Sequence, residues 1–186
     1  MGCQAEEGIT DEVAKDYKFT FIPTDIDVES LGLLSFMSEK QVELLKDYDW
    51  VLHTDLDEFI IADPLKYEDL KDFMSKTQSK QTFCEGYEIF KRIGQPPLDY
   101  SKPILEQRKY WWRDKSGSYN KPLLSRIPTR WVHGFHYIDV MSSDEVKAIK
   151  NTGLYLVHLK HVEHDNLENV ENDEGSLIPA NIRRML

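Results

Sequence analysis

Two aspartates, Asp55 and Asp57, stand two positions apart directly after the apolar and β-branched run of residues 50–54. Side chains at i and i+2 project to the same side of an extended segment, so both carboxylates can reach one point. Hard carboxylate oxygens suit Mg²⁺ or Mn²⁺, which keep several waters and accept one or two protein carboxylates together with phosphate oxygens. The spacing therefore predicts a divalent-metal site for a phosphate-bearing ligand.

Such a pair is also common on the solvated surface of an acidic chain, so its neighbours decide between the two interpretations. Glu58 and Phe59 follow the pair, and the apolar residues 60–61 precede the breaker at 63–64. A segment this apolar is unusual for a solvated loop and typical of a buried strand. We therefore expect a strand that delivers carboxylates to a site.

The stretch YDWVLHTDLDEFIIADP, residues 48–64, resembles the metal-binding segment of glycosyltransferase family 2-like enzymes, which are nucleotide-sugar transferases with the GT-A fold. Segments 86–112, 119–138 and 154–162 are similar to later segments of that group in order and spacing. The resemblance covers about residues 48–162. It implies an α/β domain with a mixed, mostly parallel sheet flanked by helices, and metal-dependent, inverting sugar transfer from a nucleotide-diphosphate donor to a carbohydrate or other hydroxyl acceptor.

In that family the two aspartates and a downstream histidine hold the ion that bridges the donor's diphosphate. The resemblance places these roles on Asp55, Asp57 and His158. His158 continues the inward positions of the apolar run 154–160, where a polar ring is unexpected unless the strand leaves the core at a site. A packed core histidine is an equal alternative at this position. His161 and His136 compete as ligands, and His53 is expected to pack.

Charge is distributed unevenly along the chain. The 186 residues have a formal charge of −10, yet residues 91–130 contain 10 Lys and Arg against 3 Asp and Glu, which leaves 13 against 30 elsewhere. A basic segment of this kind suggests that one part of the molecule meets an anion. The expected contacts to the diphosphate are Arg108, Lys109, Arg126 and above all Lys121. Gly134 and His136 are expected in a turn that allows a ligand to approach. Four aromatic residues are candidates to stack on a sugar or base: Tyr110, Trp111, Trp112 and Tyr119. Packing onto the sheet is the commoner role for each of them.

The transfer needs a base for the acceptor hydroxyl. Glu85 is the candidate that we prefer, Glu88 is an alternative, and Glu58 is expected to lie beside the metal ligands rather than to react.

Helices and strands are expected to alternate around these residues. The spacing predicts a helix over 39–48 opened by the capping box of Ser38 and Gln41, a second helix on Tyr67, and a long loop over 91–120. Strands are expected over 17–22, 50–54, 81–90, 121–127, 131–140 and 154–160, with a short helix from 142 or 143 to 150. Residues 1–16 are expected to be flexible, 17–162 to form one GT-A-like domain, and 163–186 to be an acidic, partly ordered tail.

The front of the fold is short, because only 54 residues precede Asp55 and one βαβ unit needs roughly 30 or more. We expect an N-terminally shortened domain whose nucleotide site another subunit or a missing segment completes. Two other functions stay open: a degenerate or fragmentary transferase domain that binds a carbohydrate or partner, and, less favoured because of Phe59, a DxD phosphohydrolase.

The remaining expectations concern the cellular setting. Two cysteines, the lack of a transmembrane segment and the lack of a signal peptide indicate a cytoplasmic protein. The acidic balance argues against nucleic acid as a partner.

Overall fold

The computed structural model describes residues 31–113, 119–132, 135–139, 144–145, 150–163 and 176–183. The expected flexible start, the expected strand over 17–22 and the turn residue Gly134 lie outside these residues. The helices are α2 Leu31–Leu44, α3 Leu70–Lys76, α4 Ile104–Gln107 and α6 Ala180–Arg183; the strands are β1 Val51–Leu52, β2 Glu58–Ala62, β3 Gln81–Thr82, β4 Glu85–Phe90, β5 Tyr110–Trp112, β6 Leu124–Ser125, β7 Trp131–Val132, β8 Tyr137–Ile138, β9 Leu154–His161 and β10 Ser176–Leu177.

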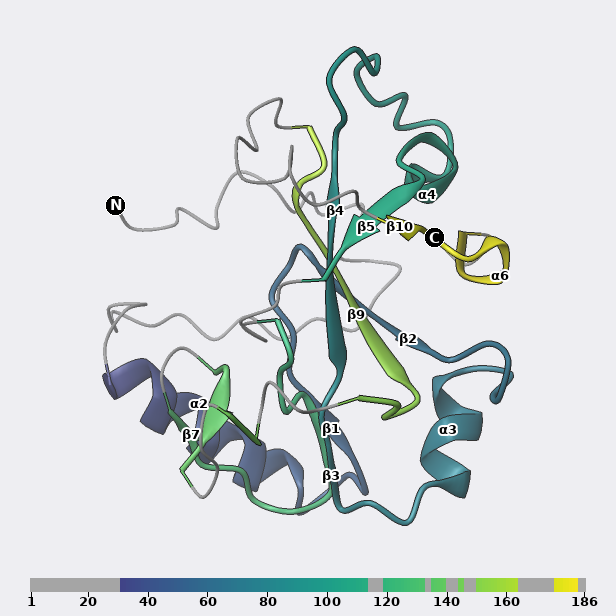
Figure 1. Cartoon of the computed structure of the whole chain (residues 1–186). Coiled ribbons are helices and arrows are strands. Elements are labelled where there is room, and N and C mark those ends of the chain that lie inside the picture. Colours follow the sequence, from purple (N-terminus) through teal and green to yellow (C-terminus); the bar gives the residue numbers. More distant parts are fainter. Residues whose placement is uncertain are drawn as a thin grey trace.

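Five of the strands form the central sheet in the order β10-β5-β4-β9-β2 (Figure 1). Only β4 and β9 are parallel neighbours, and every other pair in this sheet is antiparallel. The α/β class is confirmed, but the expectation of a mostly parallel sheet is wrong. Parallel neighbours arise when a helix returns the chain across one sheet. Here α3 connects β2 to β3 in another sheet, and the long connection over 91–109 brings β5 back antiparallel to β4.

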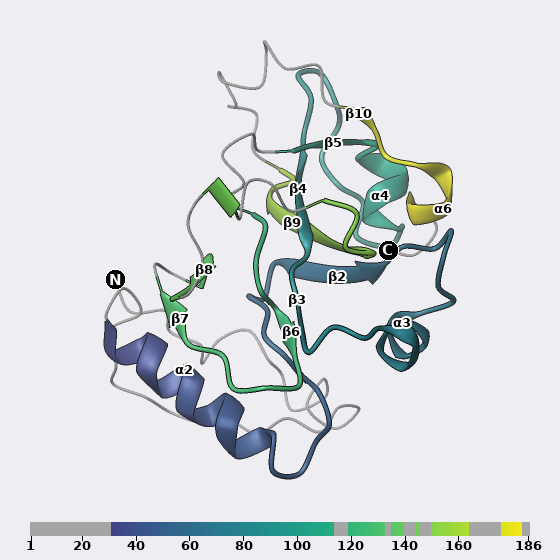
Figure 2. The ribbon, with the colours of Figure 1, turned by 60° about the horizontal axis from the view of Figure 1, so that its bottom comes forward.

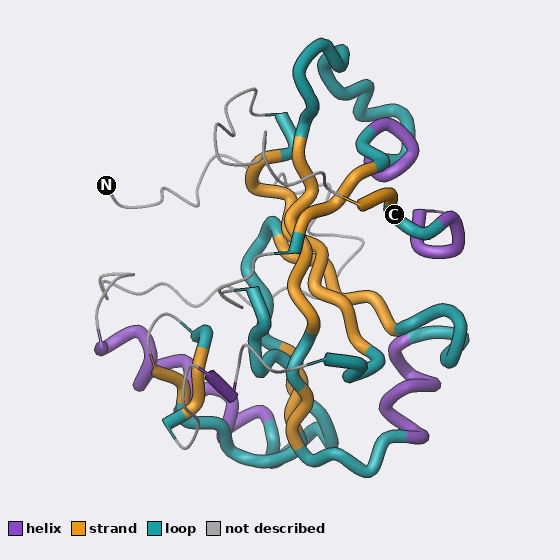
Figure 3. Tube along the Cα trace, in the orientation of Figure 1, coloured by secondary structure: helices purple, strands orange, loops and turns teal. Residues whose placement is uncertain are grey.

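Two small sheets complete the described strands. β1, β6 and β3 form an antiparallel sheet in that order, and β7 pairs with β8 as a hairpin beside α2 (Figure 3). The strand expected over 121–127 is limited to β6, and the strand expected over 131–140 is this hairpin instead. Chain reversal at Phe135, which has a positive φ of 69°, explains the difference.

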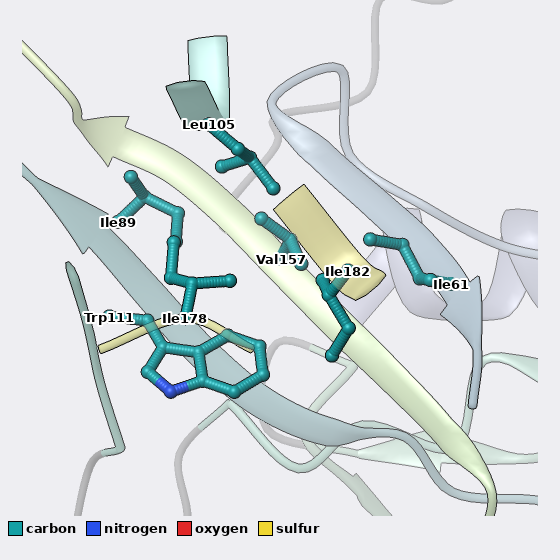
Figure 4. Packing of buried hydrophobic residues seen from close by; sticks show 7 residues of the cluster. All are labelled: Ile61, Ile89, Leu105, Trp111, Val157, Ile178 and Ile182. Carbon is teal, nitrogen blue, oxygen red and sulfur yellow. The ribbon is translucent and has the colours of Figure 1, made fainter. Parts of the chain in front are cut away.

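The central sheet buries an apolar cluster on each face. On β9, Val157 packs in one cluster and Leu154 and Leu156 in the other, since successive side chains alternate between faces. Helices α4 and α6 cover the first cluster through Leu105 and Ile182 (Figure 4). Phe73 of α3 belongs to the second cluster.

The C-terminal segment contributes to this core. β10 pairs with β5, and Ile178 and Ile182 are almost completely buried in the cluster of Figure 4. We expected the domain to end at residue 162 and an acidic tail to follow. The two isoleucines show that residues 176–183 pack with the sheet.

Helix α2 begins earlier than its sequence signal. The capping box predicted a start at residue 39, whereas the helix runs from Leu31 to Leu44 and contains Ser38 in its interior. Gln41 makes a long-range contact instead of a cap: its side-chain amide donates to Thr129 Oγ1 at 3.0 Å and its carbonyl accepts from Thr129 N at 2.6 Å. The polar pair therefore ties α2 to the chain before β7.

Several elements agree with the sequence. Helix α3, with Phe73 buried, and strand β9 lie where their periodicity predicts them, and residues 81–90 form β3 and β4 with a short break. The loop expected over 91–120 carries α4 and β5. Among the described residues, no helix combines the length and the apolar character needed to cross a membrane.

Candidate functional site

One row of residues crosses four strands of the central sheet. Glu58 of β2 pairs in register with His158 of β9, His158 with Glu88 of β4, and Glu88 with Trp112 of β5. Residues in register point to the same face of a sheet. We call the face that carries these four side chains the site face.

Asp55 and Asp57 lie in the turn between β1 and β2, at one edge of this row. The turn is closed by Glu58 N, which donates to Asp55 O at 3.2 Å, and by Asp55 N, which donates to Glu58 Oε2 at 3.2 Å. Leu159 N donates to Asp57 O at 2.9 Å and fixes the turn against β9. The sheet therefore holds the aspartate backbone beside the side chain of His158.

His158 contacts a carboxylate at each ring nitrogen. Nδ1 lies 2.5 Å from Glu88 Oε2, and Nε2 lies 3.4 Å from Asp57 Oδ2. The other oxygen of Glu88 accepts a hydrogen bond from His161 N at 3.2 Å, which fixes that carboxylate. Burial opposes the charged form of the ring, but the hydrogen bond and charge of Glu88, with the charge of Asp57, raise the pKa of His158 above its ordinary value.

Lys121 occupies the other side of the turn. Its ammonium lies 2.5 Å from Glu58 Oε1 and 3.1 Å from Asp55 Oδ2, and the side chain is almost inaccessible to solvent. Burial would lower the pKa of Lys121, but the two carboxylates, Glu58 first, raise it above its ordinary value. The sequence predicted Lys121 as a contact to the donor's diphosphate, and the structure places its ammonium against two carboxylates beside the aspartate turn.

A glycine allows the segment of Lys121 to cross the sheet. A Cβ on Gly86 would lie 2.1 Å from Tyr119 Cβ and 2.2 Å from Tyr119 O, so only glycine fits beneath that backbone. Gly86 N donates to Asn120 Oδ1 at 3.0 Å, and the ring of Tyr119 lies 5.1 Å from that of His158. The crossing thus delivers both Tyr119 and Lys121 to the site face.

The donor set is compatible with a divalent ion at Asp57 and His158. Ligand atoms that bind one ion at about 2.0–2.2 Å stand about 3.0–3.4 Å apart, near the separation of Asp57 Oδ2 and His158 Nε2. A carboxylate on the second ring nitrogen is the usual support of a metal-bound histidine, and Glu88 supplies it. Asp55 is directed to Lys121, and within the described residues no three His, Cys, Asp or Glu side chains are arranged to hold one ion.

Glu85 lies on the opposite face from this cluster. It pairs in register with Tyr155, and its carboxylate accepts from Thr152 N at 3.2 Å and lies 3.5 Å from Arg113 Nη1. The structure does not bring Glu85 to the aspartates. Glu88 is three positions later and therefore on the site face. The alternation of residues 85–90 already indicates that Glu85 and Glu88 point to opposite faces of a strand.

The other expected ligand contacts are dispersed. Arg108 is buried and binds Val162 O, Pro96 O and Glu163, so it closes the long loop onto the end of β9. Arg126 stacks on Trp50, and His136 lies in the β7–β8 turn near Tyr137. Trp112 is on the site face, Trp111 packs in the core against Tyr87, Tyr110 lies under Arg92, and Lys109 is exposed.

His53 and His161 also have defined positions. The ring of His53 packs between Trp131 and Phe135, at 5.1 and 4.5 Å between centroids, and burial lowers its pKa below the ordinary value. His161 reaches the site through its backbone amide. The sequence did not reveal the contact of Glu88 with His158, because cross-strand register is needed to place them together.

No family model, no curated protein and no solved structure matches this chain.

Proposed function

We propose that the chain is a metal-dependent glycosyltransferase that uses a nucleotide-diphosphate sugar and transfers the sugar to a carbohydrate or other hydroxyl acceptor. The observation that carries the proposal is the contact series Asp57, His158 and Glu88, in which a half-exposed carboxylate meets a histidine that a buried carboxylate orients. The motif resemblance over residues 48–162 supplies the substrate class.

The charge of the cluster supports a divalent cation. Asp55, Asp57, Glu58 and Glu88 provide four carboxylates, while Lys121 provides one ammonium. A histidine binds a metal ion through its neutral ring, so with His158 neutral and the other five groups ionised three negative charges remain in a partly buried region, where uncompensated charge is costly. A bound Mn²⁺ or Mg²⁺ would reduce them to one and would supply the positive charge that stabilises a departing diphosphate.

The protein's own residues have separate tasks in this proposal. Glu88 holds Nδ1 of His158 so that Nε2 faces Asp57, and Lys121 neutralises the buried Glu58 and keeps the aspartate turn closed. Tyr119 lies beside His158, and Trp112 follows Glu88 on the same face, so both provide aromatic surface suited to a sugar or base. We assign Glu85 no part in the transfer because its carboxylate lies on the opposite face.

A second candidate is a carbohydrate- or partner-binding domain without transfer activity. The ammonium of Lys121 already contacts Asp55, one of the two aspartates that the transferase proposal needs. A resident cation at that position favours a site that binds without an added metal.

Nucleotide binding separates the two candidates. Titration calorimetry with uridine, guanosine and thymidine diphosphates should show that one of them binds in Mn²⁺ and loses its affinity in EDTA, and its radiolabelled sugar conjugate should then be hydrolysed or transferred. Nucleotide binding without turnover would favour the binding domain. If none of the three diphosphates binds in Mn²⁺, the donor site does not exist and the transferase proposal fails.

A further inference from the structure

A cavity lies at the opposite end of β1 from the aspartate turn. Its volume is about 570 Å³, and its wall combines the chain between α2 and β1, part of α3, and Arg126 just after β6. Figure 2 shows α2 and α3 on either side of the strands β3 and β6, with the chain from α2 passing below them. The cavity has no residue in common with the carboxylate cluster.

Arg126 is held in place at this wall by an aromatic ring. Its guanidinium lies 4.0 Å from the centroid of Trp50, and Nη2 is 3.5 Å from Met74 O. Among the described residues, no carboxylate lies within ion-pair distance of it. Stacking fixes the plane of the guanidinium, while its N–H donors other than the one directed to Met74 O remain open to a ligand.

Two further polar groups of the wall, the Tyr48 hydroxyl and the Asp49 carboxylate, are available for hydrogen bonds to a ligand. Tyr48 is 62% exposed, and within the described part of the chain neither its hydroxyl nor the carboxylate of Asp49 has a hydrogen-bond partner. Ser75 Oγ donates to Asp72 O at 2.8 Å and can still accept. The cavity therefore presents an exposed aromatic ring, a fixed donor and a charged acceptor.

This combination selects for a neutral, hydroxyl-rich ligand. Asp49 repels an anion and Arg126 repels a cation, whereas a hydroxyl group donates to the carboxylate and accepts from the guanidinium. The ring of Tyr48 offers an apolar surface to the C–H face of a sugar. We propose that the cavity binds a neutral saccharide.

The site lies within reach of the aspartate turn. Trp50 and Asp55 are five positions apart, and an extended chain of five residues spans at most about 18 Å. A saccharide chain bound beside Trp50 can therefore run along β1 toward Asp57 and serve as the acceptor. This last role rests on the proposed function, while saccharide binding itself does not.

The test measures binding to the metal-free full chain without any nucleotide sugar, so its outcome is separate from that of the transferase proposal. The probes are the neutral oligosaccharides maltohexaose, cellohexaose and chitohexaose, with hexagalacturonate and the zwitterionic peptide Gly-Glu-Lys as comparators. Calorimetry should detect at least one neutral hexasaccharide. Tyr48→Ala and Arg126→Ala should each weaken it by about tenfold or more, the effect of losing one stacking or hydrogen-bonding group.

Matched controls exclude a general effect of the substitutions. Tyr100→Ala and Arg130→Ala remove an exposed tyrosine and an exposed arginine outside the cavity and should change affinity less than about twofold. Asp49→Asn keeps the stacking of Arg126 on Trp50 and should also weaken saccharide binding. This variant tests the cavity even if Arg126→Ala does not fold. The proposal is overturned if no neutral hexasaccharide binds at millimolar concentration, if only a comparator binds, or if the Tyr48 and Asp49 variants bind as tightly as the wild type.

Discussion

At the scale of single residues, the buried carboxylates of the site hold its basic side chains in place, and the exposed carboxylates face the solvent. Glu58 and Glu88 are almost inaccessible, and each contacts a basic side chain, Lys121 and His158 respectively. The side chains of Asp55 and Asp57 are 54% and 46% exposed and face the solvent from which a ligand arrives. The buried pair therefore fixes the site, and of the exposed pair Asp55 contacts Lys121, which leaves Asp57 to bind a ligand together with His158.

Lys121→Met tests this fixing role. Removing the ammonium leaves the buried carboxylate of Glu58 without its counter-ion, which should cost about 3–5 kcal/mol of unfolding free energy. The measurement is urea unfolding, with Lys109→Met as the exposed control. Adding Glu58→Gln to the first variant should recover a large part of the loss, and a double variant no more stable than Lys121→Met would contradict the pairing.

Glu88→Gln tests the orientation of His158. The amide keeps the shape and the bond to His161 N but lacks the charge that supports the ring, so Mn²⁺ affinity should fall by about 10–100-fold. Calorimetry gives the affinity and thermal unfolding the stability. Glu106→Gln, on the exposed side of α4, should match the wild type. An unchanged Mn²⁺ affinity in Glu88→Gln would remove Glu88 from the site.

At the scale of elements, register and one chain crossing bring the site together. The paired positions of β2, β9 and β4 align Glu58, His158 and Glu88, and the crossing over Gly86 adds Lys121 from a distant segment. Each contribution depends on a neighbour far away in the sequence. The site is thus a property of the sheet rather than of the aspartate turn alone.

Gly86→Ala should disrupt that crossing. The added methyl group would overlap Tyr119 and should destabilise the fold by about 1–3 kcal/mol or more, because the backbone above it must move. Gly94→Ala is the comparison, since its Cβ meets no atom within 4 Å and only its φ of 81° is unfavourable. Urea unfolding measures both. Equal losses in the two variants would contradict the close approach at Gly86.

Sequence periodicity predicted the elements that alternate strongly, and it did not predict how they pair. Strand β9 and helix α3 lie where their apolar spacing places them. The mostly parallel sheet was wrong because strand direction depends on where each connection returns. The same lack of pairing information led to the choice of Glu85 over Glu88, since the sequence shows that they face opposite sides but not which side holds the aspartates.

At the scale of the whole molecule, the uneven charge of the chain has a structural use. Three basic residues of the segment 91–130 form ion pairs: Arg108 with Glu163, Arg113 with Glu85, and Lys121 with Glu58. These carboxylates lie outside the segment, so part of its positive charge neutralises the protein's own acids. The C-terminal segment joins the same body through two buried isoleucines.

Ile178→Ala tests that attachment. The side chain is completely buried under the sheet, so truncation should cost about 2–5 kcal/mol. Leu177→Ala, at a neighbouring position that is 54% exposed, should cost less than about 0.5 kcal/mol. Urea unfolding of the two variants should differ accordingly. Equal stability would show that residues 176–183 do not belong to the core.

If Asp57 and His158 hold a divalent cation, the full chain must bind Mn²⁺ through these two side chains. Electron paramagnetic resonance of free Mn²⁺ should show one bound ion per chain in the wild type, and Asp57→Asn and His158→Ala should each weaken it by about 100-fold or more with the fold intact. Asp99→Asn, an exposed acid that pairs with Lys102 in the loop before α4, should bind as the wild type does. Failure of the wild type to bind Mn²⁺, or affinities of the Asp57 and His158 variants equal to that of the wild type, would show that these two side chains do not form a metal site.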